Sequence, residues 1–100
     1  MVIEHAVITV RPGSGGRFEE AMGQARSVIA ASPGVLSLGL HRGVEEPDRY
    51  VLLVEWETLE DHTEGFRQSE AFGAWRALIG PYFESPPVVD HMVKVEVPGR

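Results

Sequence analysis

Histidine is the residue type in this sequence most suited to moving a proton near neutral pH, and four are present. His62 follows Asp61 where a β-rich segment gives way to helical spacing, so it is expected beneath a helix, desolvated, neutral and able to accept a proton. His5 and His91 are further candidate bases, since each stands in line with apolar residues of a predicted strand. The competing interpretation is that each is a hydrogen-bonded core residue. His41 is predicted to lie on the surface.

An aromatic cluster accompanies His62 within one continuous segment. Taken singly, each ring is most simply explained as core packing in a small domain. Taken together, the rings favour a flat slot that holds a planar phenol or quinol close to a neutral histidine. Arg76 would then steady the negative charge of the deprotonated substrate. The predicted walls of this slot are Trp56, Phe66, Phe72 and Trp75.

Other chemistries lack the residues they require. The chain has no cysteine, no two histidines at i, i+4 spacing and no adjoining acid cluster, so no metal site and no cofactor is predicted. No Ser, His and Asp arrangement suggests a nucleophilic triad, and the turn at residues 12–16 lacks the lysine of a phosphate loop. A net charge of -6 argues against binding to nucleic acid or anionic membranes. A soluble, cytoplasmic protein is expected.

The elements that must position these residues follow from hydrophobic periodicity. Alternation predicts strands, and apolar residues at helical spacing predict helices that lie on a sheet. Thr58 with Asp61 resembles a capping box, Ser69 is expected to cap a second helix start, and Gly80 with Pro81 ends that helix. The predicted order is a strand at 2–10, a helix around 18–29, a strand at 35–42, a strand at 49–56, a helix pair at 58–79 and a strand at 88–97.

This order is the βαββαβ arrangement of a ferredoxin-like α+β fold with an antiparallel sheet. Right-handed crossovers place the first and third strands in the middle and both helical segments on one face of the sheet. The other face is also apolar, and one helical layer cannot cover it. We therefore expect two copies to pair sheet to sheet about a two-fold axis, as a homodimeric barrel with the helices outside.

Several segments also resemble a known family. They are EHAVITVRPG near the start, PDRYVLLVEWETLEDH and GFRQSEAFGAWRALIGPYF in the middle, and PPVVDH near the end. Together they are similar to the antibiotic biosynthesis monooxygenase (ABM) domain of the dimeric α/β-barrel superfamily. The resemblance covers nearly the whole chain and implies one such domain over residues 1–100. Such families include small oxygenases that oxidise polycyclic phenols without metal or flavin, and haem-degrading proteins.

The resemblance disfavours haem degradation in this chain. Haem-degrading relatives are expected to carry an asparagine on the first strand, a tryptophan on the helix and an iron-ligating histidine. His5, Phe66 and Arg76 stand at or near those places here. The favoured hypothesis is a cofactor-independent monooxygenase acting on a small aromatic or polyketide-like compound. The alternatives are a non-catalytic dimer that binds a small ligand, and a cyclase or isomerase, which needs the same base but no oxygen.

Overall fold

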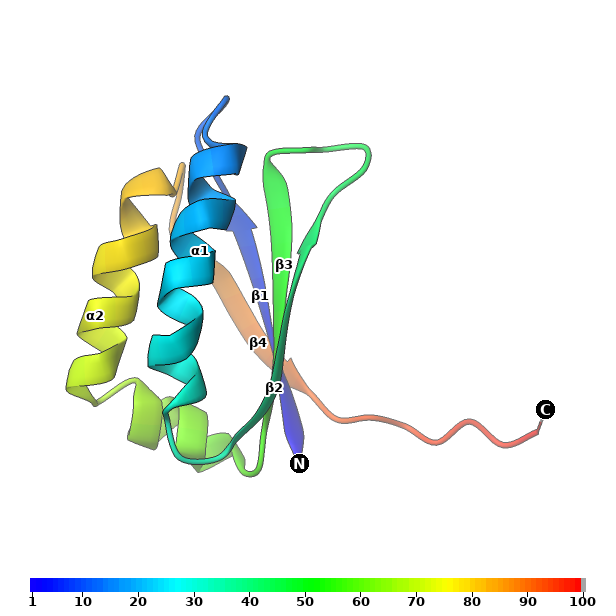
Figure 1. Cartoon of the computed structure of the whole chain (residues 1–100). Helices are drawn as coiled ribbons and strands as arrows, with labels where there is room; N and C mark the ends of the chain where they lie inside the picture. The colour runs from blue at the N-terminus through cyan, green and yellow to red at the C-terminus, as the bar shows by residue number, and fades with distance from the viewer. Residues whose placement is uncertain (100) are drawn as a thin grey trace.

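A four-stranded antiparallel sheet with two helices on one face forms the fold (Figure 1). The computed structural model describes residues 1–99. The sheet has the order β2-β3-β1-β4, so the first and third strands are central, as predicted. The strands are β1 (Val2–Thr9), β2 (Val35–Arg42), β3 (Arg49–Trp56) and β4 (Val88–Met92). The helical segments are α1 (Gly15–Ala30), η1 (Asp61–Phe66), α2 (Glu70–Ile79) and η2 (Gly80–Tyr82).

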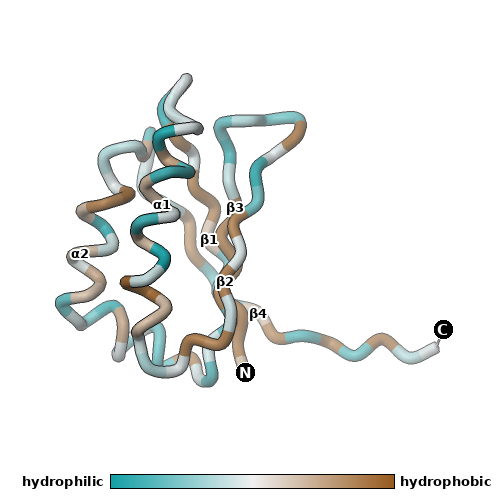
Figure 2. The backbone as a smooth tube through the Cα atoms, in the orientation of Figure 1, coloured by the Kyte–Doolittle hydropathy of each residue, from teal (hydrophilic) through white to brown (hydrophobic). Residues whose placement is uncertain are grey.

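Strand alternation decides which side chains meet the helices. β1 pairs with β3 in a register that sets Ala6 opposite Leu52 and Glu4 opposite Val54, and all four side chains are buried. The apolar stripe of α1, which includes Phe18 at 0% exposure, closes over this face. Figure 2 shows the hydrophobic segments concentrated along the strands. The core therefore lies between the sheet and the two helices, and Glu4 is the acid that enters it.

Two helix starts use the predicted caps. The Thr58 hydroxyl accepts a hydrogen bond from the Asp61 backbone N–H at 3.1 Å, and the Asp61 carboxylate accepts one from the Thr58 N–H at 3.2 Å. This reciprocal pair is the predicted capping box. The Ser69 hydroxyl accepts from the Phe72 N–H at 3.3 Å and thereby caps α2. The chain from β3 to α2 is consequently fixed at both of its turns.

The segment η1 is a π-helix, which the sequence did not predict. Its widened turn is closed by the Arg67 N–H, which donates to the His62 carbonyl at 3.0 Å, five residues back. Single π turns occur preferentially at functional sites, because they turn a side chain away from the direction that α-helical spacing would give it. Here the turn carries both His62 and Phe66 into the buried layer.

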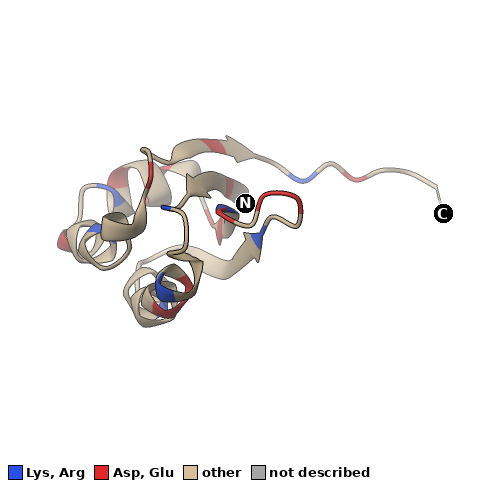
Figure 3. Ribbon diagram, turned by 90° about the horizontal axis from the view of Figure 1, so that it is seen from above, with Lys and Arg blue, Asp and Glu red and all other residues tan. Residues whose placement is uncertain are grey.

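The last strand is shorter than predicted. β4 ends at Met92, not at residue 97. Its only neighbour is β1, and Met92 already pairs with Ile3, so the chain beyond Met92 runs past the end of the sheet. Residues 93–99 leave the body as an extended tail (Figures 1 and 3). The valines at 93, 95 and 97 are 66%, 73% and 83% exposed.

The face of the sheet opposite the helices carries apolar side chains with no cover within the described chain. Odd-numbered residues of β1 and β3 point to this side, since their even-numbered neighbours are buried under the helices. Val88 and Met92 of β4 share the face and are 68% and 44% exposed. Its apolar members are Ile3, Val7, Val51, Leu53, Val88 and Met92.

Charges are mixed over the surface. Figure 3 shows Lys and Arg scattered among Asp and Glu, with no continuous basic face in that view. Among the described residues, no helix is long and apolar enough to cross a membrane.

Candidate functional site

The floor of the candidate site is Glu4, a carboxylate in the middle of an apolar strand. Its side chain points toward the helices together with Ala6 and Ile8, and the residue is 6% exposed. The indole N–H of Trp56 donates a hydrogen bond to Glu4 Oε1 at 3.0 Å. Burial raises the pKa of Glu4 above its ordinary value, while the Trp56 hydrogen bond and the charge of Arg67 act in the opposite direction. A carboxyl group whose pKa is raised is a stronger base once ionised.

His62 lies against Glu4 and joins it to the edge of the sheet. Its Nε2 is 3.3 Å from Glu4 Oε1, and its Nδ1 is 2.8 Å from Nε2 of His91. The ring stacks on Trp56 at a centroid distance of 5.1 Å and an angle of 21°. The residue is 2% exposed, so packing on one side and contacts at both nitrogens fix the orientation of its ring.

Burial also sets the charge of the two histidines. Burial, as the largest cause, and the nearby charges of Arg67 and His91 together lower the pKa of His62 to about 4. The pKa of His91 is lowered by burial and by Arg67, and Asp90 opposes this shift. The imidazole of His62 is therefore neutral at neutral pH, and its 3.3 Å contact with Glu4 joins a neutral ring to a carboxyl group rather than forming an ion pair.

The three side chains form a row with His62 in the middle. Each facing pair directs its polar atoms at one another, so the lone pairs do not converge on a common point. Within residues 1–99 no group of three or more His, Asp or Glu side chains is arranged to hold a metal ion. The row is suited instead to passing protons between neighbours, because an imidazole donates at one nitrogen and accepts at the other.

A cavity of about 330 Å³ opens from this row between the helices and the sheet. That volume is at the lower end for small-molecule sites, so a compact ligand fits. Glu4 and His62 line its polar part, and Arg67 and Arg76 bring positive charge to it. The remaining lining is mainly apolar: Ala6, Ile8, Ile29, Leu52, Phe66, Phe72, Trp75, Phe83, Pro86, Pro87 and Val89.

Aromatic rings form much of the cavity wall. Phe66 meets Phe72 edge-on at a centroid distance of 5.5 Å and Trp75 at 6.2 Å. The guanidinium of Arg76 lies 5.8 Å from the ring centre of Phe72 and 5.7 Å from that of Phe83. These contacts hold the cationic group beside the wall, where it can face an anionic ligand.

The predicted site residues separate into two groups in the structure. His62, Phe66, Phe72, Trp75 and Arg76 all line the cavity, and His91 contacts His62 from β4. Trp56 is wholly buried behind His62, so it supports the ring and does not form a wall as expected.

His5 lies apart from the site. It points to the opposite face of the sheet, where its Nδ1 is 3.0 Å from Asp90 Oδ1. Strand alternation is the reason, because Glu4 faces the helices and the next residue must face away. His5 and His91 therefore lie on opposite faces of the sheet, and of these two candidate bases only His91 contacts His62.

Glu4, Arg67 and Phe83 were not among the sequence candidates. Glu4 had a detectable signal, since it is a single acid on the same strand face as Ala6, Ile8 and Val10. Arg67 follows the π turn, and Phe83 reaches the cavity from beyond the end of α2. Neither position carries a local pattern that predicts its contact with the site.

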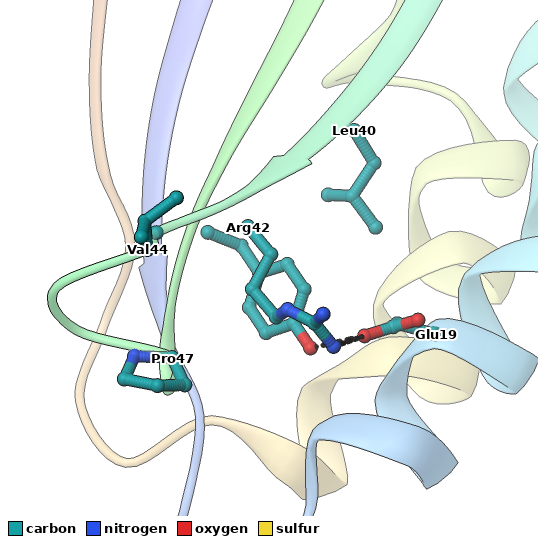
Figure 4. A pocket seen from close by; sticks show the side chains of 7 residues that line it. Glu19, Leu40, Arg42, Val44 and Pro47 are labelled. Carbon is teal, nitrogen blue, oxygen red and sulfur yellow. Dashed lines mark hydrogen bonds and ion pairs between the residues drawn. The ribbon is translucent and has the colours of Figure 1, made fainter.

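A second cavity, of about 560 Å³, lies near the turn between β2 and β3 (Figure 4). It is larger than the Glu4 cavity, but its polar side chains already form hydrogen bonds with one another. Glu19 accepts hydrogen bonds from the Tyr50 hydroxyl at 2.6 Å and from Arg42 at 3.2 Å. Burial and the neighbouring Glu19 raise the pKa of Tyr50 to about 12, so this phenol keeps its proton at neutral pH. The chemistry therefore points to the Glu4 cavity.

A four-stranded antiparallel sheet with two helices on one face is a ferredoxin-like α+β fold. The model of the family described as antibiotic biosynthesis monooxygenase matches residues 1–78. This chain belongs to the antibiotic biosynthesis monooxygenase family.

Individual relatives agree with this assignment. The uncharacterised Bacillus subtilis protein YczJ is 42% identical over 95 residues, which is 95% of this chain and all of that protein. A solved structure from Bordetella bronchiseptica, named for the same family, superposes with a TM-score of 0.93 at 43% identity and covers 95% of this chain and 97% of its own. SnoaB, a cofactor-independent oxygenase from Streptomyces nogalater, shares the fold with a TM-score of 0.80 at 16% identity, over 96% of this chain and 94% of its own.

Proposed function

We propose that this protein is a cofactor-independent monooxygenase that oxidises a small phenolic aromatic or polyketide-like compound. The observation that carries the proposal is the buried Glu4–His62 pair at the polar end of an aromatic-walled cavity. Oxygenation without a cofactor needs an electron-rich substrate anion, and a desolvated base beside the ring supplies it. The family membership and the activity named for SnoaB agree with this chemistry.

The residues suggest how such a reaction proceeds. The Glu4–His62 pair takes the phenolic proton, and Arg76 stabilises the phenolate that results. The phenolate passes one electron to O₂, and the two radicals combine at the ring carbon para to the oxygen, which forms a C–O bond. The peroxide takes up a proton, the ring carbon loses its hydrogen as a proton, and the O–O bond breaks. The products are a quinone and one water molecule, so O₂ supplies one oxygen atom to each.

We further propose that the working form is a homodimer joined through the open faces of the two sheets. The six apolar side chains of that face lie on three strands, with the His5–Asp90 pair among them, and have no cover within the described chain. A face of this kind on a soluble protein is typical of an interface. Glu4 and His62 lie on the helix side, so each protomer would keep its own cavity.

The probe for the oxygenase reaction is 1,5-dihydroxynaphthalene, because its oxidation at the para position gives the coloured quinone juglone. One molecule of O₂ should be consumed per juglone formed, and one water molecule is released. The rate should fall at least about 100-fold in Glu4→Gln, which keeps the shape and the hydrogen bond from Trp56 but removes the base. Oxygen uptake and absorbance are recorded together, with Gln24→Ala, on the exposed side of α1, as a surface control.

Two other outcomes would assign a different function. Binding of the naphthol without oxygen uptake would favour the cyclase or isomerase alternative, which uses the same base. If the protein neither binds nor oxidises any of a panel of phenols, while small anionic ligands raise its melting temperature, it is a ligand-binding protein of another class.

A further inference from the structure

The row of Glu4, His62 and His91 runs from the cavity to the edge of the sheet. Glu4 lines the cavity at one end. The two steps along the row measure 3.3 Å, from Glu4 Oε1 to His62 Nε2, and 2.8 Å, from His62 Nδ1 to His91 Nε2. At the other end His91 is partly exposed and belongs to β4, which lies at the edge of the sheet beside β1. A continuous path therefore leads from the buried carboxyl group toward solvent.

Neutral imidazoles allow only two proton arrangements along this path. In the first, Glu4 is protonated and donates to His62 Nε2, while His62 Nδ1–H donates to His91 Nε2. In the second, Glu4 is ionised and accepts from His62 Nε2–H, while His62 Nδ1 accepts from His91 Nε2–H. Conversion of the first into the second moves one proton from Glu4 to His91, which releases its own Nδ1 proton to water.

We propose that Glu4, His62 and His91 form a proton relay that releases one proton from Glu4 to solvent, which leaves the carboxylate that deprotonates the substrate, and returns one proton to Glu4 later in the cycle. This inference rests on the proposed function, since the relay serves a base that faces a phenol. Glu4 touches the substrate, whereas His91 acts through His62 and is a relay residue. His91 has no place in the cavity lining, so it has no contact with the substrate.

The charges around the row favour outward movement. Arg67 stands near all three groups and disfavours a second positive charge on either ring. Asp90, adjacent to His91 on β4, stabilises a proton on His91. His91 is also partly exposed to solvent, whereas His62 is 2% exposed and its burial disfavours the charged ring. Trp56 on β3 donates to Glu4 and carries no charge. A proton that leaves Glu4 is therefore held more favourably at the outer ring than at the inner one.

The reaction needs transfer in both directions. Outward transfer of the Glu4 proton through the two rings leaves the carboxylate that takes the phenolic proton, so one proton leaves for each phenol ionised. Glu4 then gives the phenolic proton to the cleaved peroxide, and the inward step returns one proton from solvent to Glu4. The return step also restores the first arrangement of the two rings, so neither imidazole has to rotate. The relay thus returns to its starting state in each turnover.

Stopped-flow mixing with 1-naphthol tests the relay in wild type and in His91→Ala. The naphtholate is followed by its own absorbance, and proton release is followed by a pH indicator in weak buffer. We expect equal affinity for 1-naphthol in both proteins, proton release slowed at least tenfold in His91→Ala, and recovery on addition of free imidazole. Equal release rates in the two proteins would overturn the relay. The matched control is His41→Ala, which removes a histidine from the exposed part of β2.

A second measurement separates failure of the relay from failure of the proposed function. Nitrogen NMR of the ligand-free protein should show that, of the facing atoms His62 Nδ1 and His91 Nε2, one carries a proton and the other does not. Two protonated nitrogens at these positions would exclude the relay, whatever the substrate is. Absence of naphtholate in wild type with an intact nitrogen pattern would instead contradict the proposed function.

Discussion

The indole N–H of Trp56 donates a hydrogen bond of 3.0 Å to Glu4, and the same indole stacks on His62 at 5.1 Å. One buried side chain therefore positions both Glu4 and His62. Because Trp56 is 0% exposed, the polar atoms of the pair are shielded from water on that side. Shielding of this kind produces the opposed pKa shifts of Glu4 and His62.

Replacement of Trp56 by Phe should destabilise the protein through Glu4. The substitution removes the only N–H donor of β3 that reaches the carboxyl group, and an unsatisfied buried acceptor costs about 1–3 kcal/mol. Urea denaturation measures the free energy of unfolding. The matched control is Trp75→Phe, which removes the same atoms from a buried ring with no side-chain hydrogen bond. An equal loss in both variants would show that packing alone accounts for the effect.

His62 should make the stability of the fold depend on pH between about 4 and 6.5. Its pKa is about 4 when folded and near 6.5 when unfolded, so the unfolded chain binds more protons within this range. Its contribution is therefore complete above pH 6.5 and is lost as the pH falls, by up to roughly 3 kcal/mol. The raised pKa of Glu4 acts in the opposite sense. The folded state holds the Glu4 proton more tightly than the unfolded chain does, so this contribution to the free energy of unfolding is lost as the pH rises.

The variant His62→Phe isolates this contribution. It keeps an aromatic ring against Trp56 but cannot titrate. The decline in unfolding free energy between pH 7 and pH 4.5, measured by urea denaturation, should be smaller in the variant than in wild type. A decline of the same size in both proteins would mean that His62 is not the group responsible.

Ser69 should stabilise the helix that carries the aromatic wall. Its hydroxyl accepts from the Phe72 N–H at 3.3 Å and donates to the Phe66 carbonyl at 2.6 Å, so it joins η1 to α2. Ser69→Ala should lower the free energy of unfolding by about 1 kcal/mol. Ser85→Ala, in an exposed loop, should leave it unchanged. A loss no larger than that of Ser85→Ala would argue against the cap.

The open face of the sheet should hold two copies together. Leu53→Asp places a charge in the middle of this face, where burial against a partner would be costly, and should convert the dimer into a monomer. Sedimentation velocity at micromolar concentration distinguishes the two forms. Ala74→Asp, on an exposed position of α2, should leave the dimer intact. A wild-type protein that sediments as a monomer would refute the proposed assembly.

Local rules predicted the parts of the fold that depend on neighbouring residues. Strand alternation, the Thr58–Asp61 capping box and the Ser69 cap involve residues within a few positions of one another, and all three are present. The length of β4 was overestimated because alternation continues to residue 97, whereas the strand ends where its partner β1 begins. The end of a strand is set in this way by a partner strand that is distant in the sequence.

The positions of the site residues depend on which residues of neighbouring strands are paired. Hydrophobic periodicity does not predict that pairing. His5 and His91 lie on adjacent strands, as the topology implied, but Glu4 pairs with His91 while His5 pairs with Asp90. A shift of one residue reverses the face on which each side chain lies. The π turn likewise decides that His62 enters the buried layer. The aromatic residues near the site could be predicted from the sequence. The position of Glu4 at the floor of the cavity could be recognised only from the pairing of the strands.

The most direct test of the account is the ionisation state of 1-naphthol bound in the cavity at pH 7, read from its absorbance. This phenol is neutral in water at that pH, and its anion absorbs at longer wavelength. We predict that wild type binds it largely as the naphtholate and that Glu4→Gln binds it as the neutral phenol. Bound naphthol that remains neutral in wild type, or that is ionised equally in Glu4→Gln, would contradict the claim that Glu4 and His62 deprotonate the substrate.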